Sequence, residues 1–481
     1  MVRRLDAVSW ILVAVTLLAI AAGCSPKRTL VPNLPPETTL FVQGPVDTVN
    51  HVVRLFWFGS DPDGDVAGFE VRFHNPEAPA DTEWHFTQST DIQFTVFTPN
   101  GVTQPLFEVR AIDNTGLRDP TPAREDFTFS NRPPTVDFIS APGFSDTTFA
   151  SVTLRWAAND PDGDGSRMRF RVWLDGHMAD AHDTTATTFT IPTADFLQNG
   201  VLASGYRKVF VQAVDDGGMA GPPDSTTWFV RSPVTGTRAR LLLIDDIPTS
   251  APGNVTFDTL YYNTAARNLA ADQYTILQLQ FTQPFRSNAD VAQTFALFDA
   301  VIWYRGREPI SSSMSSFQDG LGAYLEQGGN LLLESLNLVD GEGSQGVLRE
   351  DWLDRYMGSD RLFQHIIAGR ADSTVDWSIN TQGAMFSSFG DSLWAIPTGG
   401  VRAFQVRNAS YALLDAVPGS MAVGNDISLP IDISVPQTSG GRFVGFSMPV
   451  RLSHQVSPTG TPGNGHTFLA KVFEQLGLTG P

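Results

Sequence analysis

The sequence predicts two all-β sandwiches followed by an α/β domain with a doubly wound parallel sheet. The acidic stretches SDPDGD (60–65) and NDPDGD (159–164) each lie between segments in which apolar and polar residues alternate. Such alternation indicates half-buried strands. After residue 237 the pattern changes to short apolar runs separated by helical segments, which is typical of buried parallel strands with crossover helices. The length of 481 residues agrees with about three domains.

The two acidic stretches belong to an internal repeat. In each unit a strand ending in tryptophan, Trp57 or Trp156, precedes the acidic stretch, and two further strands follow it. The predicted strands are 52–57, 68–73 and 107–114 in the first unit, and 152–156, 170–174 and 209–216 in the second. A repeat of this size predicts two tandem β-sandwich domains, 37–131 and 132–233, which meet at the sequence NRPP.

The strands GFEVRF and FEVRAIDNTG, together with the tryptophan of the preceding strand, resemble fibronectin type III and related immunoglobulin-like modules. The resemblance covers residues 37–233. It implies the fold of these modules and says almost nothing about function.

The third domain, residues 238–481, contains the segments LLLIDD, FDAVIWYRG, LGAYLEQGGNLLLES and GGRFVGFSMP. These segments resemble the class I glutamine amidotransferase-like fold, which has a flavodoxin-like sheet. Within the domain we predict a helix over 315–327 and a strand over 330–335. Residues of about 341–440 are predicted to form an insertion with a short helix (DWLDRYMG) and several strands.

The resemblance does not extend to catalysis. The family places a cysteine on the turn after the central strand, because amide attack needs a strong nucleophile. Here that turn carries Glu334 and Ser335, and Cys24 is the only cysteine of the chain. Glutamine amidotransferase activity is therefore excluded. Ser335 with His454 or His466 as its base is an alternative catalytic pair, but the G-x-S-x-G turn of serine hydrolases is absent.

Acidic residues end the first strand of this domain. Asp245 and Asp246 lie where α/β sheets bind ligands, and Glu334 follows a neighbouring strand. These three residues form the candidate ligand-binding set. The alternative is that they cap helices or lie in solvated loops.

Residues 1–24 have the layout of a secretory signal, with Arg3 and Arg4 before an apolar run. The sequence IAAGC resembles a bacterial lipobox, with Ala21 where the pattern usually has leucine. We predict lipidation of Cys24, followed by a Pro-rich tether over 25–36. Acyl chains on Cys24 would anchor the protein to a membrane of the bacterial cell envelope, and we expect the outer membrane.

The repeated acidic stretches have two interpretations. The B–C and F–G loops of such sandwiches lie at one end, so their oxygen-bearing side chains could converge on Ca²⁺. Alternatively, Asp-Pro and Asp-Gly form tight turns in which the aspartate accepts bonds from its own backbone. The candidate calcium ligands are Asp61, Asp63, Asp65, Asp113 and Asn114 in the first unit, and Asp160, Asp162, Asp164, Asp215 and Asp216 in the second.

The net charge of −19 disfavours nucleic acid and anionic lipid surfaces as partners. None of the lysines lies in a phosphate-loop motif, which excludes nucleoside triphosphate chemistry of that type. We therefore predict a lipid-anchored envelope protein with a non-catalytic binding, structural or adhesion role. In this interpretation the sandwiches are spacers, and the third domain binds a glycan or an envelope protein. The alternative is a secreted hydrolase acting on a polysaccharide or ester through acids at the sheet edge.

Overall fold

The computed structural model divides into two compact units, residues 1–131 and 132–481. The described residues are 32–42, 52–77, 83–163, 165–233, 240–248, 274–279, 284–336, 338, 348–357, 359–362, 375–379, 393–395, 404–406, 412–416, 430–446 and 472–478. No helix in these ranges is long and apolar enough to cross a membrane.

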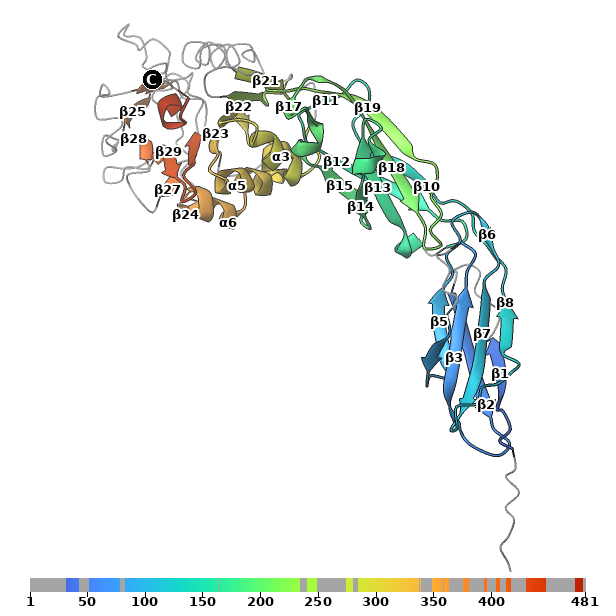
Figure 1. Ribbon diagram of the computed structural model, residues 1–481. Helices are drawn as coiled ribbons and strands as arrows, with labels where there is room; N and C mark the ends of the chain where they lie inside the picture. The colour runs from blue at the N-terminus through green and yellow to red at the C-terminus, as the bar shows by residue number, and fades with distance from the viewer. Residues whose placement is uncertain are drawn as a thin grey trace, which may run out of the picture. The chain divides into compact units, whose positions relative to one another are not determined.

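The first unit is a β-sandwich of a three-stranded and a four-stranded antiparallel sheet (Figure 1). The three-stranded sheet has the order β1 (Glu37–Val42), β2 (Val52–Ser60), β5 (Asp91–Thr95). The four-stranded sheet has the order β4 (His85–Thr87), β3 (Val66–His74), β7 (Leu106–Asp113), β8 (Ala123–Asp126), and a short pair joins β6 (Val102–Thr103) to β9 (Phe129–Ser130). The strict alternation of buried and half-buried residues along β7 is the pattern expected of a strand with one face in the core.

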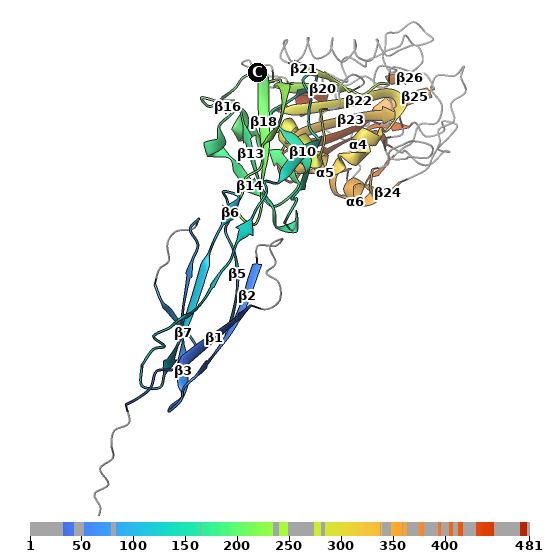
Figure 2. The same ribbon diagram turned by 90° about the vertical axis from the view of Figure 1, so that its right-hand side faces the viewer.

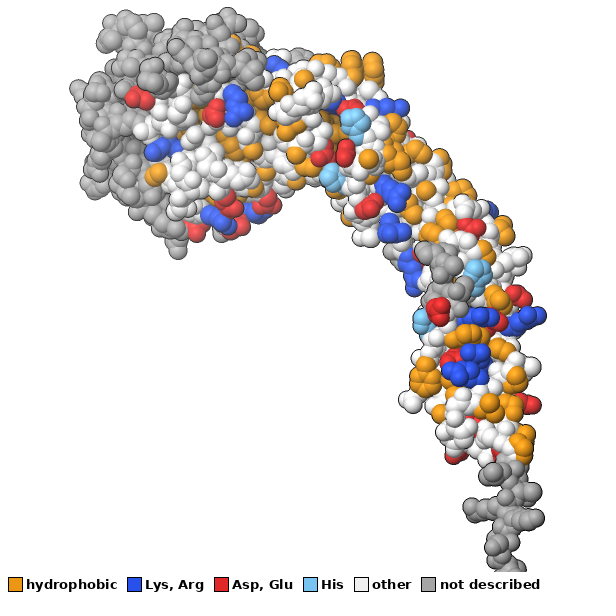
Figure 3. Space-filling model, in the orientation of Figure 1, with side chains coloured by type: hydrophobic (Ala, Val, Ile, Leu, Met, Phe, Trp, Pro, Cys, Tyr) orange, Lys and Arg blue, Asp and Glu red, His pale blue; other side chains and the backbone are white. Residues whose placement is uncertain are grey.

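The outer face of the four-stranded sheet carries an ion-pair network. Glu70 lies 2.7 Å from Arg110 and 2.9 Å from Arg118, and the bond from Arg118, opposed by partial burial, lowers the pKa of the Glu70 carboxyl. Basic and acidic side chains accordingly lie next to each other on the surface of this unit (Figure 3). The network thus pairs opposite charges on one face of the sheet.

The second sandwich repeats this plan. One sheet has the order β10 (Thr135–Ser140), β12 (Val152–Asn159), β15 (Thr188–Ile191). The other has the order β11 (Thr147–Thr148), β19 (Asp224–Val230), β18 (Gly205–Val214), β13 (Arg169–Leu174), β14 (His182–Thr184), and β16 (Leu197–Gln198) pairs with β17 (Val201–Leu202). Trp57 packs edge-on against Phe69, and Trp156 packs edge-on against Phe170. The predicted pair of β-sandwiches, with equivalent core tryptophans, is confirmed.

The C-terminal region is built on a nine-stranded sheet (Figure 2). Its parallel part has the spatial order β21 (Tyr274–Gln278), β20 (Leu241–Asp245), β22 (Ala300–Pro309), β23 (Asn330–Leu336), β30 (Arg442–Phe446). Four antiparallel strands continue the sheet beyond β30 in the order β29 (Pro430–Pro436), β28 (Ala412–Ala416), β25 (Val375–Ile379), β26 (Leu393–Ala395). The insertion predicted over 341–440 thus contributes strands to the same sheet.

Outside this sheet, the insertion contains a separate pair, β24 (Ser359–Leu362) and β27 (Phe404–Val406). A single helical stretch precedes the pair, formed by α6 (Glu350–Trp352) and a π-helical turn over Leu353–Met357. The stretch corresponds to the short helix predicted from the sequence DWLDRYMG.

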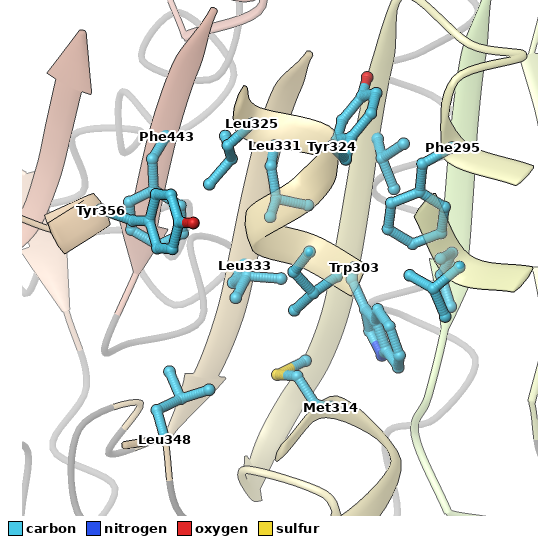
Figure 4. Packing of buried hydrophobic residues seen from close by; sticks show 14 of the residues in the cluster. Phe295, Trp303, Met314, Tyr324, Leu325, Leu331, Leu333, Leu348, Tyr356 and Phe443 are labelled. Carbon is cyan, nitrogen blue, oxygen red and sulfur yellow. The ribbon is translucent and has the colours of Figure 1, made fainter. Parts of the chain in front are cut away.

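Helices cover one face of the parallel strands. α3 (Asn288–Phe295) and α5 (Gln318–Glu326) place Phe295, Tyr324 and Leu325 against Trp303 and Leu331 (Figure 4). The single helix predicted over 315–327 is instead divided into α4 (Ser312–Ser316) and α5. The Ser311 side chain caps α4, and Phe317, with φ −100° and ψ 15°, separates the two helices.

The second sandwich contacts this region within the same compact unit. α3 lies beside β12 (Figure 1), where Thr153 donates a 2.6 Å hydrogen bond to the Asp290 carboxylate. Phe149 packs edge-on against Phe298 at 5.4 Å between ring centroids. Burial raises the pKa of the Asp290 carboxyl. The hydrogen bond from Thr153 offsets part of the free-energy cost of burying this acid in the contact.

Candidate functional site

The first acidic stretch forms a tight turn directly after β2. The Asp63 amide donates to Asp61 Oδ1 at 3.2 Å, which is the backbone bond expected of an aspartate-initiated turn. The Asp61 carboxylate folds over Gly64, where an added Cβ would lie 2.8 Å from Oδ2. Glycine is therefore required at this position for space.

The second stretch repeats the turn. The Asp162 amide donates to Asp160 Oδ1 at 3.3 Å, and a Cβ on Gly163 would lie only 1.9 Å from Asp160 Oδ2. The shared spacing of two aspartates and one glycine thus follows from a single turn geometry. Asp164, the last acid of this stretch, lies outside the described residues.

The B–C and F–G loops of the first sandwich meet, as their topology predicts. The Asn114 amide donates to the Asp65 carbonyl at 2.9 Å. In the F–G loop, the Asp113 carboxylate accepts bonds from the Thr115 and Leu117 amides and from the Asn33 side chain. Burial opposes ionisation of Asp113, but the bonds from Asn33, Leu117 and Thr115 outweigh it and lower its pKa to about 2.

The corresponding loops of the second sandwich have a different electrostatic balance. Burial, followed by the charge of Asp215 and the proximity of Asp162, raises the pKa of Asp160 to about 6. The Asp215 carboxylate accepts a bond from the Met219 amide, and Asp216 lies 3.9 Å from Arg167. The neighbouring acids Asp215 and Asp162 therefore act on Asp160 at this end of the second sandwich.

The described residues contain no group of three or more histidine, cysteine or acidic side chains arranged to hold a metal ion. Calcium binding by either loop stays a prediction. Asp61 Oδ1 and Asp160 Oδ1 accept the backbone bonds that the tight-turn interpretation requires. The other carboxylate oxygen of each, Asp61 Oδ2 and Asp160 Oδ2, is buried without a hydrogen-bond partner among the described residues.

A row of buried polar residues crosses the carboxyl end of the parallel strands. Asp245, Tyr304 and Glu334 are register partners on β20, β22 and β23, and each is at most 1% exposed. Their strand neighbours Trp303 and Leu333 belong to the core under the helices. Because successive side chains alternate between faces, the row lies on the opposite face of the sheet.

Asp246 is separated from this row. Its carboxylate accepts bonds from Trp303 Nε1 at 3.1 Å and Ser311 Oγ at 2.5 Å, and Arg305 lies 3.2 Å away. Burial raises the pKa of Asp246 against the effect of Ser311 and Arg305. Asp246 thus joins the end of β20 to the N-terminal cap of α4, whereas Asp245 and Glu334 share the row.

The candidate catalytic residues have contrasting placements. Ser335 is completely buried, although a nucleophile has to reach its substrate. His454 and His466 lie outside the described residues, as does the lipidation candidate Cys24. Tyr304 could be named from the sequence as one aromatic of a possible carbohydrate surface, but its place between the two carboxyl groups could not be predicted. The bond between Asn33 and Asp113 was not predicted either. The repeated pattern N-x-P-P at 33–36 and 131–134 was a usable signal for Asn33.

No family model matches the chain, and no curated protein does. Among solved structures, the chain is similar to the fibronectin(III)-like modules of Clostridium thermocellum CbhA, with 19% identity, 40% of this chain and 94% of that chain covered, and a TM-score of 0.18. A two-domain fibronectin type III segment of chicken tenascin matches with 13% identity, coverage of 40% and 97%, and a TM-score of 0.18. The PKD1 domain of Vibrio anguillarum Epp matches with 13% identity, coverage of 20% and 96%, and a TM-score of 0.15.

Proposed function

We propose that this chain is a lipid-anchored protein of the bacterial cell envelope with a binding or structural role and no catalysis. The signal-like N-terminus with Cys24 supports the anchor, and the two β-sandwiches support a spacer or adhesion role. In this proposal the sandwiches carry a degenerate amidotransferase-like domain that binds a glycan or another envelope protein.

The relation to the amidotransferase-like fold rests on the order of the parallel strands. Numbered along the chain, β21, β20, β22, β23 and β30 give the order 2-1-3-4-5, which is that of flavodoxin-like sheets. The family's catalytic cysteine lies on the turn after the strand that corresponds to β23. The sequence predicted Glu334 and Ser335 on that turn, but both residues lie within β23, which extends to Leu336.

The observation that carries the non-catalytic proposal is the burial of these two residues at the carboxyl end of β23. Glu334 is 1% exposed and Ser335 is 0% exposed. A nucleophile on a strained strand-to-helix turn works because the turn exposes it. A buried serine next to a buried carboxyl group instead favours a structural role for these two side chains, and binding through another part of the domain.

A hydrolase is the second candidate, and one observation favours it. Asp245 and Glu334 lie on strands two apart, with Tyr304 between them. Neighbouring strands lie about 4.8 Å apart, so the two backbone positions are separated by roughly 10 Å. Paired carboxyl groups on either side of a bond are the arrangement that glycoside hydrolysis uses.

A binding and turnover assay on the full chain in detergent distinguishes the candidates. Glycans and envelope fractions are tested for binding, and polysaccharides and esters are tested for hydrolysis. We expect binding without turnover, and the same affinity in Glu334→Gln. Hydrolysis that is lost in both Asp245→Asn and Glu334→Gln would establish the hydrolase instead.

The anchor is tested separately by fractionating cells. Cys24→Ala removes the acylated thiol, so the protein should leave the membrane fraction. Cys24→Ala protein that still sediments with membranes after a high-salt wash would contradict lipidation as the anchor.

A further inference from the structure

Both sandwiches begin with the same four-residue pattern. Residues 33–36 read NLPP and residues 131–134 read NRPP, directly before β1 and β10. Proline has no amide hydrogen. The amides of Leu34 and Arg132 are therefore the last backbone donors before the first strand of each sandwich.

These two amides bond to equivalent acids. Leu34 donates to the Asp63 carboxylate, with 3.2 Å to each oxygen. Arg132 donates from its amide to Asp162 Oδ1 at 3.3 Å, and its Nε lies 3.3 Å from Oδ2. In both loops the acceptor is the middle aspartate of Asp-Pro-Asp-Gly-Asp.

The remaining residues of each loop hold that middle aspartate in place. The Asp61 and Asp160 side chains accept a hydrogen bond from the backbone amide of the middle aspartate in their own loop. The glycine after the middle aspartate leaves space for these carboxylates. A preorganised acceptor of this kind loses little freedom when it forms the bond, so the bond is stronger than one to a mobile side chain. The loop sequence and the N-x-P-P segment therefore fit one another as a pair.

We propose that each acidic loop is a clasp that fixes the incoming N-x-P-P segment to its own sandwich. In the first sandwich Asn33 adds a second point of attachment, through Asp113 and through Thr115 at 3.2 Å. At the other N-x-P-P segment, Asn131 bonds to Gly101 and Thr98 of the first unit, and Arg132 bonds within the second. Asn131 and Arg132, the two residues at the boundary, thus each bond to their own unit.

Hydrogen exchange at single amides tests the clasp on the full chain in detergent. In the wild type we expect Leu34 and Arg132 to exchange slowly. Asp63→Ala should accelerate exchange at Leu34 by about tenfold or more, because bonds to charged acceptors are the strong ones, and leave Arg132 unchanged. Asp162→Ala should do the reverse.

Asp65→Ala is the matched control, because it removes one carboxylate charge from the same loop. The bond that Asp65 accepts from the Asn114 amide is made by its backbone carbonyl, which the variant keeps. It should leave Leu34 protected. Asp63→Asn retains one side-chain oxygen, so exchange at the Leu34 amide should be intermediate between wild type and Asp63→Ala. This variant provides the test if Asp63→Ala does not fold. Fast exchange at Leu34 in the wild type, or equal protection in Asp63→Ala, would overturn the clasp. Added calcium should change neither amide, and calcium that released Leu34 would show that the carboxylate serves an ion instead.

Discussion

The two acidic loops share a sequence and a turn, yet different acids have shifted pKa values at the corresponding ends of the two sandwiches, Asp113 in the first and Asp160 in the second. In the first sandwich the Asn33 amide reaches Asp113 and helps to lower its pKa to about 2. In the second, the equivalent Asn131 bonds to the preceding unit, and Asp160 keeps a pKa raised to about 6 by burial and by Asp215. The repeated turn thus keeps its backbone geometry, while the pKa of each acid near it depends on the burial and the partners of that acid.

The largest difference between the loops should come from their glycines. Gly163→Ala places a methyl group 1.9 Å from Asp160 Oδ2, compared with 2.8 Å for Gly64→Ala and Asp61. We expect Gly163→Ala to lower the free energy of unfolding by about 1–3 kcal/mol, and Gly64→Ala to lower it less. Calorimetric melts of the full chain measure both.

The cause of this glycine effect can be checked in a second background. Without the carboxylate, the alanine has space and restricts the unfolded chain. Gly163→Ala in an Asp160→Ala background should therefore stabilise by roughly 0.4–1 kcal/mol. If Gly163→Ala destabilises equally in both backgrounds, the steric account of the spacing shared by the two loops is wrong.

A smaller effect should appear in the pH dependence of the second sandwich. The folded pKa of Asp160 is raised to about 6, so the folded state holds a proton that the unfolded chain releases near pH 4. The contribution of Asp160 to the free energy of unfolding should be largest below about pH 4 and should fall as the pH rises to about 6. Asp160 is partly exposed, which limits the size of the effect. Melting temperatures of Asp160→Asn, measured between pH 4 and 7, should lose this slope.

The first sandwich should respond to acid in the opposite sense. Asp113 has a lowered pKa, so its contribution is present above about pH 4 and is lost as the pH falls towards 2. Asn33→Ala removes one of its donors, which should raise the pKa of Asp113 and shift acid unfolding to higher pH. Acid titration followed by tryptophan fluorescence measures the shift, with Asn100→Ala as a surface control. An unchanged acid midpoint would mean that Asn33 does not act on Asp113.

The smallest expected effect is that of calcium. If the bonds within each turn are the whole role of the acids, melts in calcium and in EDTA should coincide for both sandwiches. A calcium site would instead stabilise by about 2.7 kcal/mol at a hundredfold excess over Kd. A response confined to one sandwich, and abolished by Asp63→Asn or Asp162→Asn, would identify which copy binds the ion.

Much of the β-sandwich architecture could be predicted, because half-buried strands leave a two-residue period in the sequence. β7 and β18 fall close to the segments predicted from that period. The meeting of the B–C and F–G loops also followed from topology. The pairing of Leu34 with Asp63 did not, because it joins residues 29 positions apart and leaves no periodic signal.

The C-terminal region shows the same limit. The parallel strands β20, β22 and β23 were predictable as continuous apolar runs. Register was not, and only register places Tyr304 between Asp245 and Glu334. The division of the predicted helix 315–327 depends on Ser311, whose hydroxyl caps α4 and also bonds Asp246. Such a contact depends on the tertiary fold.

The bonds that fix Asn33 and Leu34 to the first sandwich would limit the distance between this sandwich and a lipid on Cys24. Asn33 is the ninth residue after Cys24, and an extended chain spans at most about 3.6 Å per residue. The segment from a lipidated Cys24 to Asn33 would then span at most roughly 30 Å, which is about the thickness of the hydrocarbon layer of a bilayer. The end of the first sandwich that bears Asp61, Asp63 and Asp65 would be the end held towards the bilayer.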